Sequence, residues 1–418
     1  MLHARLIARL GILSLLAFVL LLCVDASASP AFQGKGKGKS EKKGMEVFEE
    51  EDPYTKGEKE LINKLGYARL GHGAWHKGED TQTLQMNMGG VSMLFVETEH
   101  FNIASSLTTY YIPNNRDERD KIKGEFKRLK KKLGKFKPPK NAIDPWLRLH
   151  LYAQRAEDQY AAFCEEFGLS LADYGKGGLH LGYPNKIQLI ICQRKSEFGR
   201  YVRNYHNSDM EYSYRVINPR EVMIAAANIE ALKEGWEMEE EMPFDSILHN
   251  MVTSTLTSSF VDGFNDNMYS APRWFVYGLS HRHVRSVDPE WPLFDGRKDG
   301  QGGGDEHWDW EPRVYNLAKN EFFASFKDMC LWKKYEDLHQ RDHMVSWSKV
   351  EFLLTKLEGD PKAFLKSICA ATGGFSSNES DDKLAARQIA ALSSHFGMTP
   401  EEFDKAWRKW VLKTYRKK

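Results

Sequence analysis

Two apolar helical segments joined by a polar connection constrain this chain more than any other feature of its sequence. In the first segment, apolar residues recur at the i, i+3, i+4 spacing of a helix that faces a core. They are Phe244, Ile247, Leu248, Met251, Val252 and Leu256. Pro243 lies just ahead of them, where a proline costs a helix nothing. After a connection rich in Asn, Asp and Gly, Pro272 opens a second such segment. The sequence therefore predicts two consecutive core helices within residues 243–286.

This pair of segments resembles the active-site core of gluzincin-type zinc metallopeptidases and of secreted bacterial proteins similar to them. In that family a His-Glu-x-x-His helix supplies two zinc ligands and a general base, and a later helix supplies a glutamate as third ligand. Two histidines four residues apart share one helix face and can bind one tetrahedral zinc ion. The glutamate after the first histidine polarises the zinc-bound water. The stretch Pro272-Arg273-Trp274-Phe275, followed by Gly278-Leu279, carries the resemblance most clearly.

The resemblance implies that three of the four positions that perform chemistry in the family have been lost. His249 occupies the first ligand position, Asn250 that of the general base, Thr253 the second ligand position and Tyr277 the third. His281 stands one turn after Tyr277, where related enzymes carry an acidic residue behind the ligand. An amide cannot take a proton from water, and Thr253 offers at most a hydroxyl. We therefore expect no catalytic residue and no bound cofactor.

The function implied by the resemblance is that of a secreted, catalytically inactive metallopeptidase-like protein. We expect it to bind a peptide, a protein or a cell-envelope partner through its former active-site cleft, lined by His249, Thr253, Tyr277 and His281. The alternative belongs to a different class. It is an active zinc metallohydrolase with an atypical metal site that uses His249, His281 or His283. Stoichiometric zinc in the mature protein would favour the alternative.

The N-terminus has the pattern of an export signal. Arg5 and Arg9 precede an apolar run from Leu10 to Val24, and Ala26-Ser27-Ala28 fits a small-residue cleavage site. We predict a signal peptide over residues 1–28 and a secreted or periplasmic protein, with an uncleaved membrane anchor as the alternative. No later run is long and apolar enough to span a bilayer.

The charge balance excludes partners that bind by bulk electrostatics. The chain has 59 basic and 58 acidic residues, and removal of Arg5, Arg9 and Asp25 with the signal leaves 57 of each. A balanced charge gives no general attraction to nucleic acid or to an anionic membrane. We therefore expect no nucleic-acid partner and no membrane association beyond the signal.

Residues 29–140 divide into a linker and a first folded segment. The Gly/Lys-rich and acidic residues 29–60 are too polar to bury a core, which predicts a flexible linker. Residues 61–140 contain two candidate antiparallel strands, Val91–Glu97 and Phe101–Leu107, followed by a basic helix. One narrow apolar seam runs along that helix, formed by Ile122, Phe126, Leu129 and Leu133.

Residues 141–300 form the segment that we interpret as the peptidase-like core. It begins with one long helix from Asp144, a capping residue, to Gly168. It continues with strands at Ile187–Cys192, Tyr212–Val216 and Val222–Asn228, and with a short helix from Ser196 onward. The order of these elements again resembles the sheet lobe of gluzincins.

Residues 301–418 are predicted to be a helical C-terminal lobe, with helices over 314–329, 344–359, 360–374 and 383–397 and one capped by Thr399. The resemblance covers most of residues 90–418. The predicted fold class is α+β. A small mixed or antiparallel sheet lobe is followed by the active-site helices and then by the mainly helical lobe.

Four cysteines remain after residues 1–28, namely Cys164, Cys192, Cys330 and Cys369. An even number in an exported chain permits two disulfides. Each cysteine also has apolar neighbours in the sequence, as buried free thiols do. The sequence leaves the disulfide state and the oligomeric state open.

Overall fold

The computed structural model describes residues 48–415, except residues 49–50, 77, 176, 236–241, 267–270, 292–308 and 370–379. The predicted signal peptide lies outside the described residues and stays a prediction. No helix within the described ranges is long and apolar enough to cross a membrane. Residues Glu46–Lys418 form one compact unit.

The predicted linker extends too far toward the C-terminus. Asp52 already belongs to the fold, because it is buried and its Oδ2 lies 3.2 Å from Nε2 of the buried His150. Thr55 is buried beside it and donates a hydrogen bond to the same carboxylate. An acidic run predicts a solvated segment, but here one carboxylate is the partner of an interior imidazole.

A mixed sheet of six strands lies at the centre of the fold, in the order β1-β2-β3-β6-β8-β7. The strands are β1 (Arg69–Leu70), β2 (Leu94–Glu97), β3 (Phe101–Ser105), β6 (Ile187–Cys192), β7 (Ser213–Asn218) and β8 (Val222–Asn228). Strands β3, β6 and β8 are parallel to one another, and the other pairings are antiparallel. The α+β class and the mixed sheet are thus confirmed. The predicted segments 61–140 and 141–300 both contribute strands to this one sheet.

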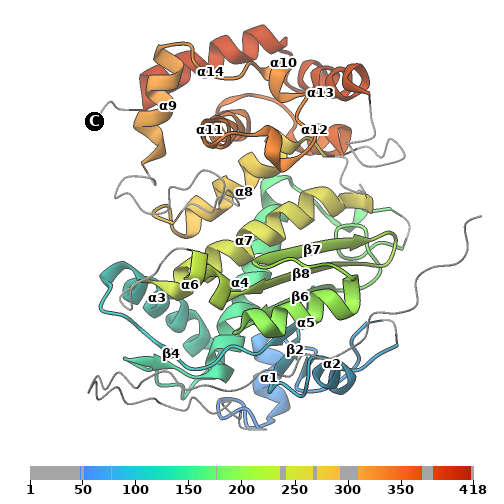
Figure 1. The fold of residues 1–418 in the computed structure, drawn as a ribbon, viewed down its shortest axis with the longest axis vertical. Helices are drawn as coiled ribbons and strands as arrows, with labels where there is room; N and C mark the ends of the chain where they lie inside the picture. The colour runs from blue at the N-terminus through green and yellow to red at the C-terminus, as the bar shows by residue number, and fades with distance from the viewer. Residues whose placement is uncertain are drawn as a thin grey trace, which may run out of the picture. The chain divides into compact units, whose positions relative to one another are not determined.

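Helices cover both faces of the sheet (Figure 1). On one face lie α4 (Pro145–Glu166) and α7 (Phe244–Gly263), and on the other lie α2 (Thr81–Asn87) and α5 (Lys195–His206). A strand covered on both faces reads as a continuous apolar run. Strand β6 has this pattern and is buried along its whole length. The remaining elements of this half are α1 (Lys59–Leu65), α3 (Arg116–Leu133), α6 (Ile229–Gly235) and the pair β4 (Tyr110–Tyr111) and β5 (Ala142–Ile143).

The local signals for the two long helices of this half are confirmed. Asp144 caps α4 by accepting a hydrogen bond from the backbone amide of Leu147, and Pro145 occupies the first turn. The four residues of the apolar seam on α3 are all buried. The basic side chains of α3 therefore belong to a helix that packs on its own protein through one narrow face.

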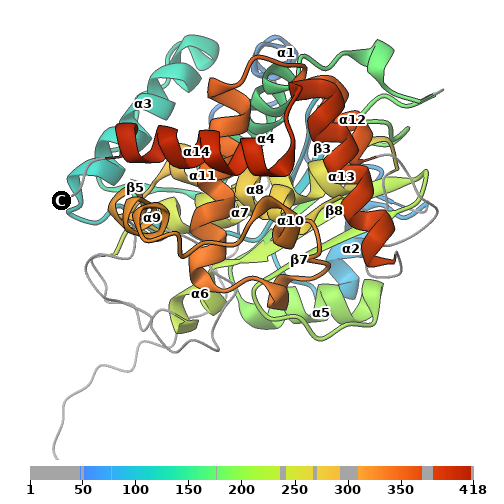
Figure 2. The ribbon, with the colours of Figure 1, turned by 90° about the horizontal axis from the view of Figure 1, so that it is seen from above.

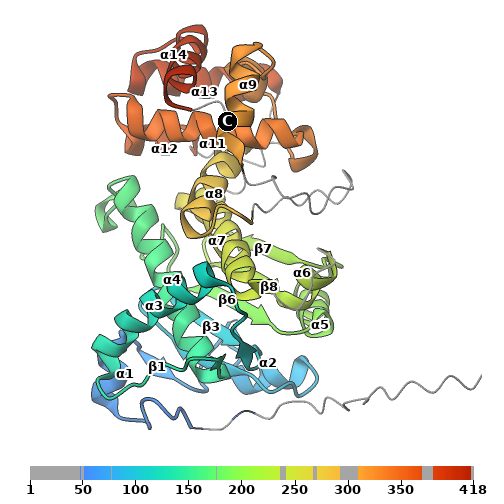
Figure 3. The same ribbon diagram turned by 90° about the vertical axis from the view of Figure 1, so that its left-hand side faces the viewer.

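Helix α8 (Arg273–Val287) connects the sheet region to the C-terminal helices, because it packs against α7 on one side and against α11 on the other (Figures 1 and 3). Gly278 permits the close approach to α11. A Cβ atom at this position would lie 2.6 Å from the backbone oxygen of Ser346. The glycine of the sequence motif thus has a packing reason.

The C-terminal helices are α9 (Trp310–Lys319), α10 (Phe326–Met329), α11 (Gln340–Lys356), α12 (Pro361–Ile368), α13 (Asp381–Phe396) and α14 (Pro400–Thr414). In Figure 2, α14 crosses α11. The capping box predicted at Thr399 is present. The prediction of a single helix over residues 314–329 is wrong. The chain leaves the helix after Asn320, since Glu321 adopts the left-handed conformation with φ 55°.

All four cysteines are free in the structure. Cys192, Cys330 and Cys369 are buried, and Cys164 is half-buried. Burial raises the pKa of each of these thiols. The structure thus agrees with the free-thiol alternative.

Candidate functional site

Helix α7 carries the first three positions of the peptidase pattern, and it is a core helix. Its residues are buried throughout, except His249 and Ser254. The polar residues of α7 are therefore buried together with its apolar ones. Asn250 and Thr253 are therefore enclosed by their neighbours, with exposed fractions of 0% and 2%.

Helices α7 and α8 run in opposite directions. The side-chain amide of Asn250, early in α7, donates hydrogen bonds to the carbonyl of Asp288 at 2.9 Å and to that of Trp291 at 3.0 Å, just after α8 ends. At the opposite ends, Arg273 at the start of α8 pairs with Asp262 at the end of α7. The contacts of Asn250 thus fasten the end of α8 to the beginning of α7.

This antiparallel packing separates positions that the sequence analysis placed in one site. Tyr277 lies one turn from Arg273, and so near the Asp262 end of α7. His249 precedes Asp262 by thirteen residues, or about 20 Å along the helix at 1.5 Å per residue. The structure therefore does not bring His249 and Asn250 together with Tyr277. Spacing along the chain could not reveal this, since it does not specify which turns of two helices face each other.

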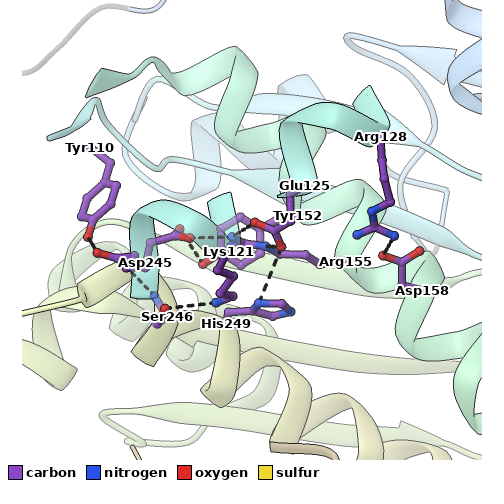
Figure 4. A network of polar contacts seen from close by, with 11 residues as sticks. Tyr110, Lys121, Glu125, Arg128, Tyr152, Arg155, Asp158, Asp245, Ser246 and His249 are labelled. Carbon is purple, nitrogen blue, oxygen red and sulfur yellow. Dashed lines mark hydrogen bonds and ion pairs between the residues drawn. The ribbon is translucent and has the colours of Figure 1, made fainter. Parts of the chain in front are cut away.

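His249 faces a buried network of charged groups from α3, α4 and α7 (Figure 4). At its centre, Arg155 donates two hydrogen bonds to Glu125, at 2.8 and 2.7 Å, and one to Asp245 at 2.6 Å. His249 Nδ1 lies 4.0 Å from Glu125 Oε1, beyond hydrogen-bond distance. Burial lowers the pKa of His249 well below its usual value, and the nearby cations Arg155 and Lys121 lower it further. The imidazole is therefore neutral.

The far side of this network holds a carboxyl group that titrates near neutrality. Glu118 accepts hydrogen bonds from the Tyr110 hydroxyl at 2.7 Å and from the backbone amide of Ser246 at 3.0 Å. Burial and the nearby Asp245 carboxylate raise the pKa of Glu118 to about 7. Burial alone would raise the pKa of Asp245 as well, but Arg155 holds it at about 2.

Sequence reasoning missed this network, although one signal of it was present. Arg148 and Arg155 lie seven residues apart on the otherwise apolar face of α4, and both are buried. A long cation on an apolar helix face needs an acidic partner in the interior. The acidic partners of Arg155 come from α3 and α7, so that the network ties three helices together. Neither cavity described below is lined by residues of the network, and its charges are paired internally.

His281 belongs to a separate cluster between α8 and the C-terminal helices. Its Nε2 lies 3.0 Å from Nδ1 of His343, and both rings are buried. Burial lowers the pKa of His343 to about 3 and that of His281 well below its usual range. One neutral imidazole therefore donates to the other. Tyr277 packs against the ring of His343, with ring centroids 5.7 Å apart, and Trp310 against that of His281 at 5.0 Å.

His283 points to neither of these clusters. Its Nδ1 lies 3.0 Å from the Thr257 hydroxyl and 2.6 Å from the Gln159 amide, and its Nε2 lies 2.8 Å from Glu166. The three histidines of the alternative zinc site thus have three different sets of neighbours. Over the described ranges, no three side chains of the metal-binding types His, Cys, Asp and Glu form a group that could hold a metal ion.

The α7–α8 pair thus holds polar side chains in internal contacts with the rest of the core. Comparison with known proteins adds no family assignment. No protein-family model matches the chain, and no curated protein matches it in sequence.

Proposed function

We propose that this protein is a catalytically inactive, gluzincin-like protein of the secreted or periplasmic space, which acts by binding a peptide, protein or cell-envelope partner. One observation carries the proposal: the positions expected to perform chemistry are occupied by side chains committed to internal contacts. Asn250, Thr253 and His281 are buried, and His249 and Tyr277 are largely enclosed.

The chemistry of these side chains supports the same conclusion. A catalytic zinc site needs three protein ligands and an open fourth position for water or substrate. Asn250 uses both hydrogens of its amide to hold the end of α8, and His281 is hydrogen-bonded to His343. These groups contribute to the packing of the core. The binding surface in this proposal therefore lies outside the five positions.

Metal analysis of the mature protein tests the proposal directly. The chain would be expressed from Ser29 onward, purified without metal-affinity steps, and assayed for zinc by mass spectrometry. We expect far less than one equivalent of zinc and no change in melting temperature when a chelator is added, because a metal that binds only the folded state would raise its stability. One equivalent of zinc, together with chelator-sensitive cleavage of a peptide library, would establish the alternative metallohydrolase.

A further inference from the structure

A polar cavity lies over the sheet, on the face that α2 and α5 cover and away from α7 and α8. It has a volume of about 470 Å³ and adjoins a second cavity of about 240 Å³. Trp75, His76 and Gln188 line both cavities. Small-molecule sites in proteins commonly occupy about 300–1,000 Å³. The space thus suffices for a small ligand.

The floor of the cavity is a row of polar residues that the strand register places side by side. Glu97 on β2 pairs with Asn102 on β3, and Asn102 pairs with Gln188 on β6. Further along the same face of these strands stand Ala104 and Ile190, which belong to the apolar layer beneath α2 and α5. The apolar layer therefore ends at this row, and polar side chains replace it at the first residues of the parallel strands.

Three residues that line the cavity each have a buried polar atom with no hydrogen-bond partner among the described residues. These atoms are Oε1 of Gln188, Oδ1 of Asn102 and Nδ1 of His180. Gln188 is only 2% exposed and His180 only 8% exposed. A buried polar group without a partner costs about 1–3 kcal/mol, and a ligand that bonded to these groups would remove that cost.

The charged groups around the cavity are paired with one another. Glu97 accepts from Lys186 at 2.8 Å and from Arg69 at 2.9 Å, and the Glu221 carboxylate lies 3.6 Å from His76. Burial lowers the pKa of His180 to about 4, so its ring is neutral at physiological pH. The lining side chains with an unpartnered polar atom are thus two amides and a neutral imidazole. These groups suit a neutral ligand that both donates and accepts hydrogen bonds.

We propose that this cavity binds a neutral polyhydroxylated ring, that is, a saccharide. Hydroxyl groups satisfy amide oxygens by donating to them, and each accepts a hydrogen bond in return. Trp75 provides an apolar surface beside them. The ring comes either from a free saccharide or from the end of a glycan chain. This inference stands independently of the proposed loss of catalysis, since no residue of α7 or α8 lines either cavity.

Titration calorimetry on the mature protein tests this proposal. The probes are glucose and N-acetylglucosamine, the disaccharides cellobiose and chitobiose, and a longer chito-oligosaccharide, with inorganic phosphate as the charged comparison. We expect at least one saccharide to bind with a dissociation constant below about 1 mM, and phosphate not to bind. Preference for the monosaccharides would indicate a free sugar, and preference for the longer chain would indicate a glycan.

Two variants locate the site. Gln188→Leu and Asn102→Leu each remove a hydrogen-bond acceptor and should weaken saccharide binding about tenfold. Gln82→Leu, at an exposed position of α2 outside both cavities, is the matched control and should bind as wild type does. If Gln188→Leu does not fold, the binding measured for Asn102→Leu alone shows whether the saccharide occupies this cavity. Absence of binding to every saccharide, binding of phosphate alone, or saccharide binding that both variants leave unchanged would each overturn the proposal.

Discussion

The α7–α8 pair and the cavity above the sheet both place polar side chains in the interior, but the two regions differ in the hydrogen bonds that these side chains make within the protein. On α7, the amide nitrogen of Asn250 donates two hydrogen bonds to backbone carbonyls of the protein, while its Oδ1 has no partner among the described residues. In the cavity, the amide oxygen of Gln188 is equally well buried and has no partner among the described residues. Asn250 thus joins two elements through its amide nitrogen, whereas Gln188 has a buried amide oxygen without a bond to the protein.

This difference bears on where function resides in the protein. A buried donor that is hydrogen-bonded within the protein, such as the Asn250 amide nitrogen, contributes to stability and has no hydrogen left to offer a ligand. A buried polar group without a partner is a cost to stability that a ligand can relieve. The helices that resemble a peptidase therefore belong to the framework, and the polar row at the end of the parallel strands is the better place to look for a ligand.

The largest effect is expected where the framework depends on charge. Replacing Arg155 by Met would leave Glu125 and Asp245 buried without their cation, and removal of one partner from a buried pair costs about 3–5 kcal/mol. Urea unfolding measures the loss. The matched control is Arg128→Met, because the ion pair of Arg128 with Asp158 is half exposed and should contribute less than about 1 kcal/mol. Equal losses in the two variants would contradict the framework role of the network.

A second effect concerns the neutral histidine pair at α8. The pKa of His343 is about 3 in the folded protein, and about 6.5 when unfolded, so between these values the unfolded chain binds the extra proton. Stability therefore falls as the pH drops through this window. Between about pH 7 and about pH 5, wild type should lose about 2 kcal/mol more than His343→Asn, which lacks this group.

Urea midpoints at the two pH values give this difference in pH dependence. Comparison with wild type cancels the contribution of groups that both proteins share, such as Glu118. Thr355→Asn, at an exposed position of the same helix, removes no titrating group and is the control, which should keep the wild-type slope. If His343→Asn also keeps it, the pKa of His343 is the same in the folded and the unfolded protein, and burial does not exclude the proton.

A smaller effect is expected at the amide that fastens the two helices. Asn250→Leu withdraws the hydrogen bonds to the carbonyls of Asp288 and Trp291, which should cost about 1–3 kcal/mol. Thermal and urea unfolding would measure it. Asn63→Leu, on the exposed side of α1, should change the free energy of unfolding by less than about 0.5 kcal/mol. A loss at Asn250 no greater than at Asn63 would show that these bonds contribute nothing to stability.

The smallest effect, with the opposite sign, is expected in the cavity. Gln188→Leu is the same kind of change as Asn250→Leu, but it removes a group that has no partner to lose. The free energy of unfolding should stay unchanged or rise by up to about 1 kcal/mol, as happens when a polar group kept for binding is replaced by an apolar one. A loss as large as that of Asn250→Leu would remove the distinction between the two regions.

Much of the secondary structure followed from local pattern. Strands β6 and β8 were predicted with the bounds that the structure has, because apolar runs between turn residues specify strands locally. The caps at Asp144 and Thr399 likewise marked where α4 and α14 begin. The break after Asn320 was missed, since the left-handed backbone of Glu321 has no signal in the apolar spacing of the residues around it.

The candidate site could be predicted only in part. Local spacing determined that α7 and α8 are core helices, and the sequence alone shows that Asn250, Thr253 and Tyr277 are not the residues that the predicted resemblance would require. Only the tertiary structure decided that His249 faces Arg155 and Glu125 while Tyr277 faces His343. It also set Asn102 beside Gln188 through the parallel register of two strands far apart in the chain. The physical reason is that helix and strand formation depends on neighbours a few residues away, whereas the partner of a buried polar group is set by how whole elements pack against one another.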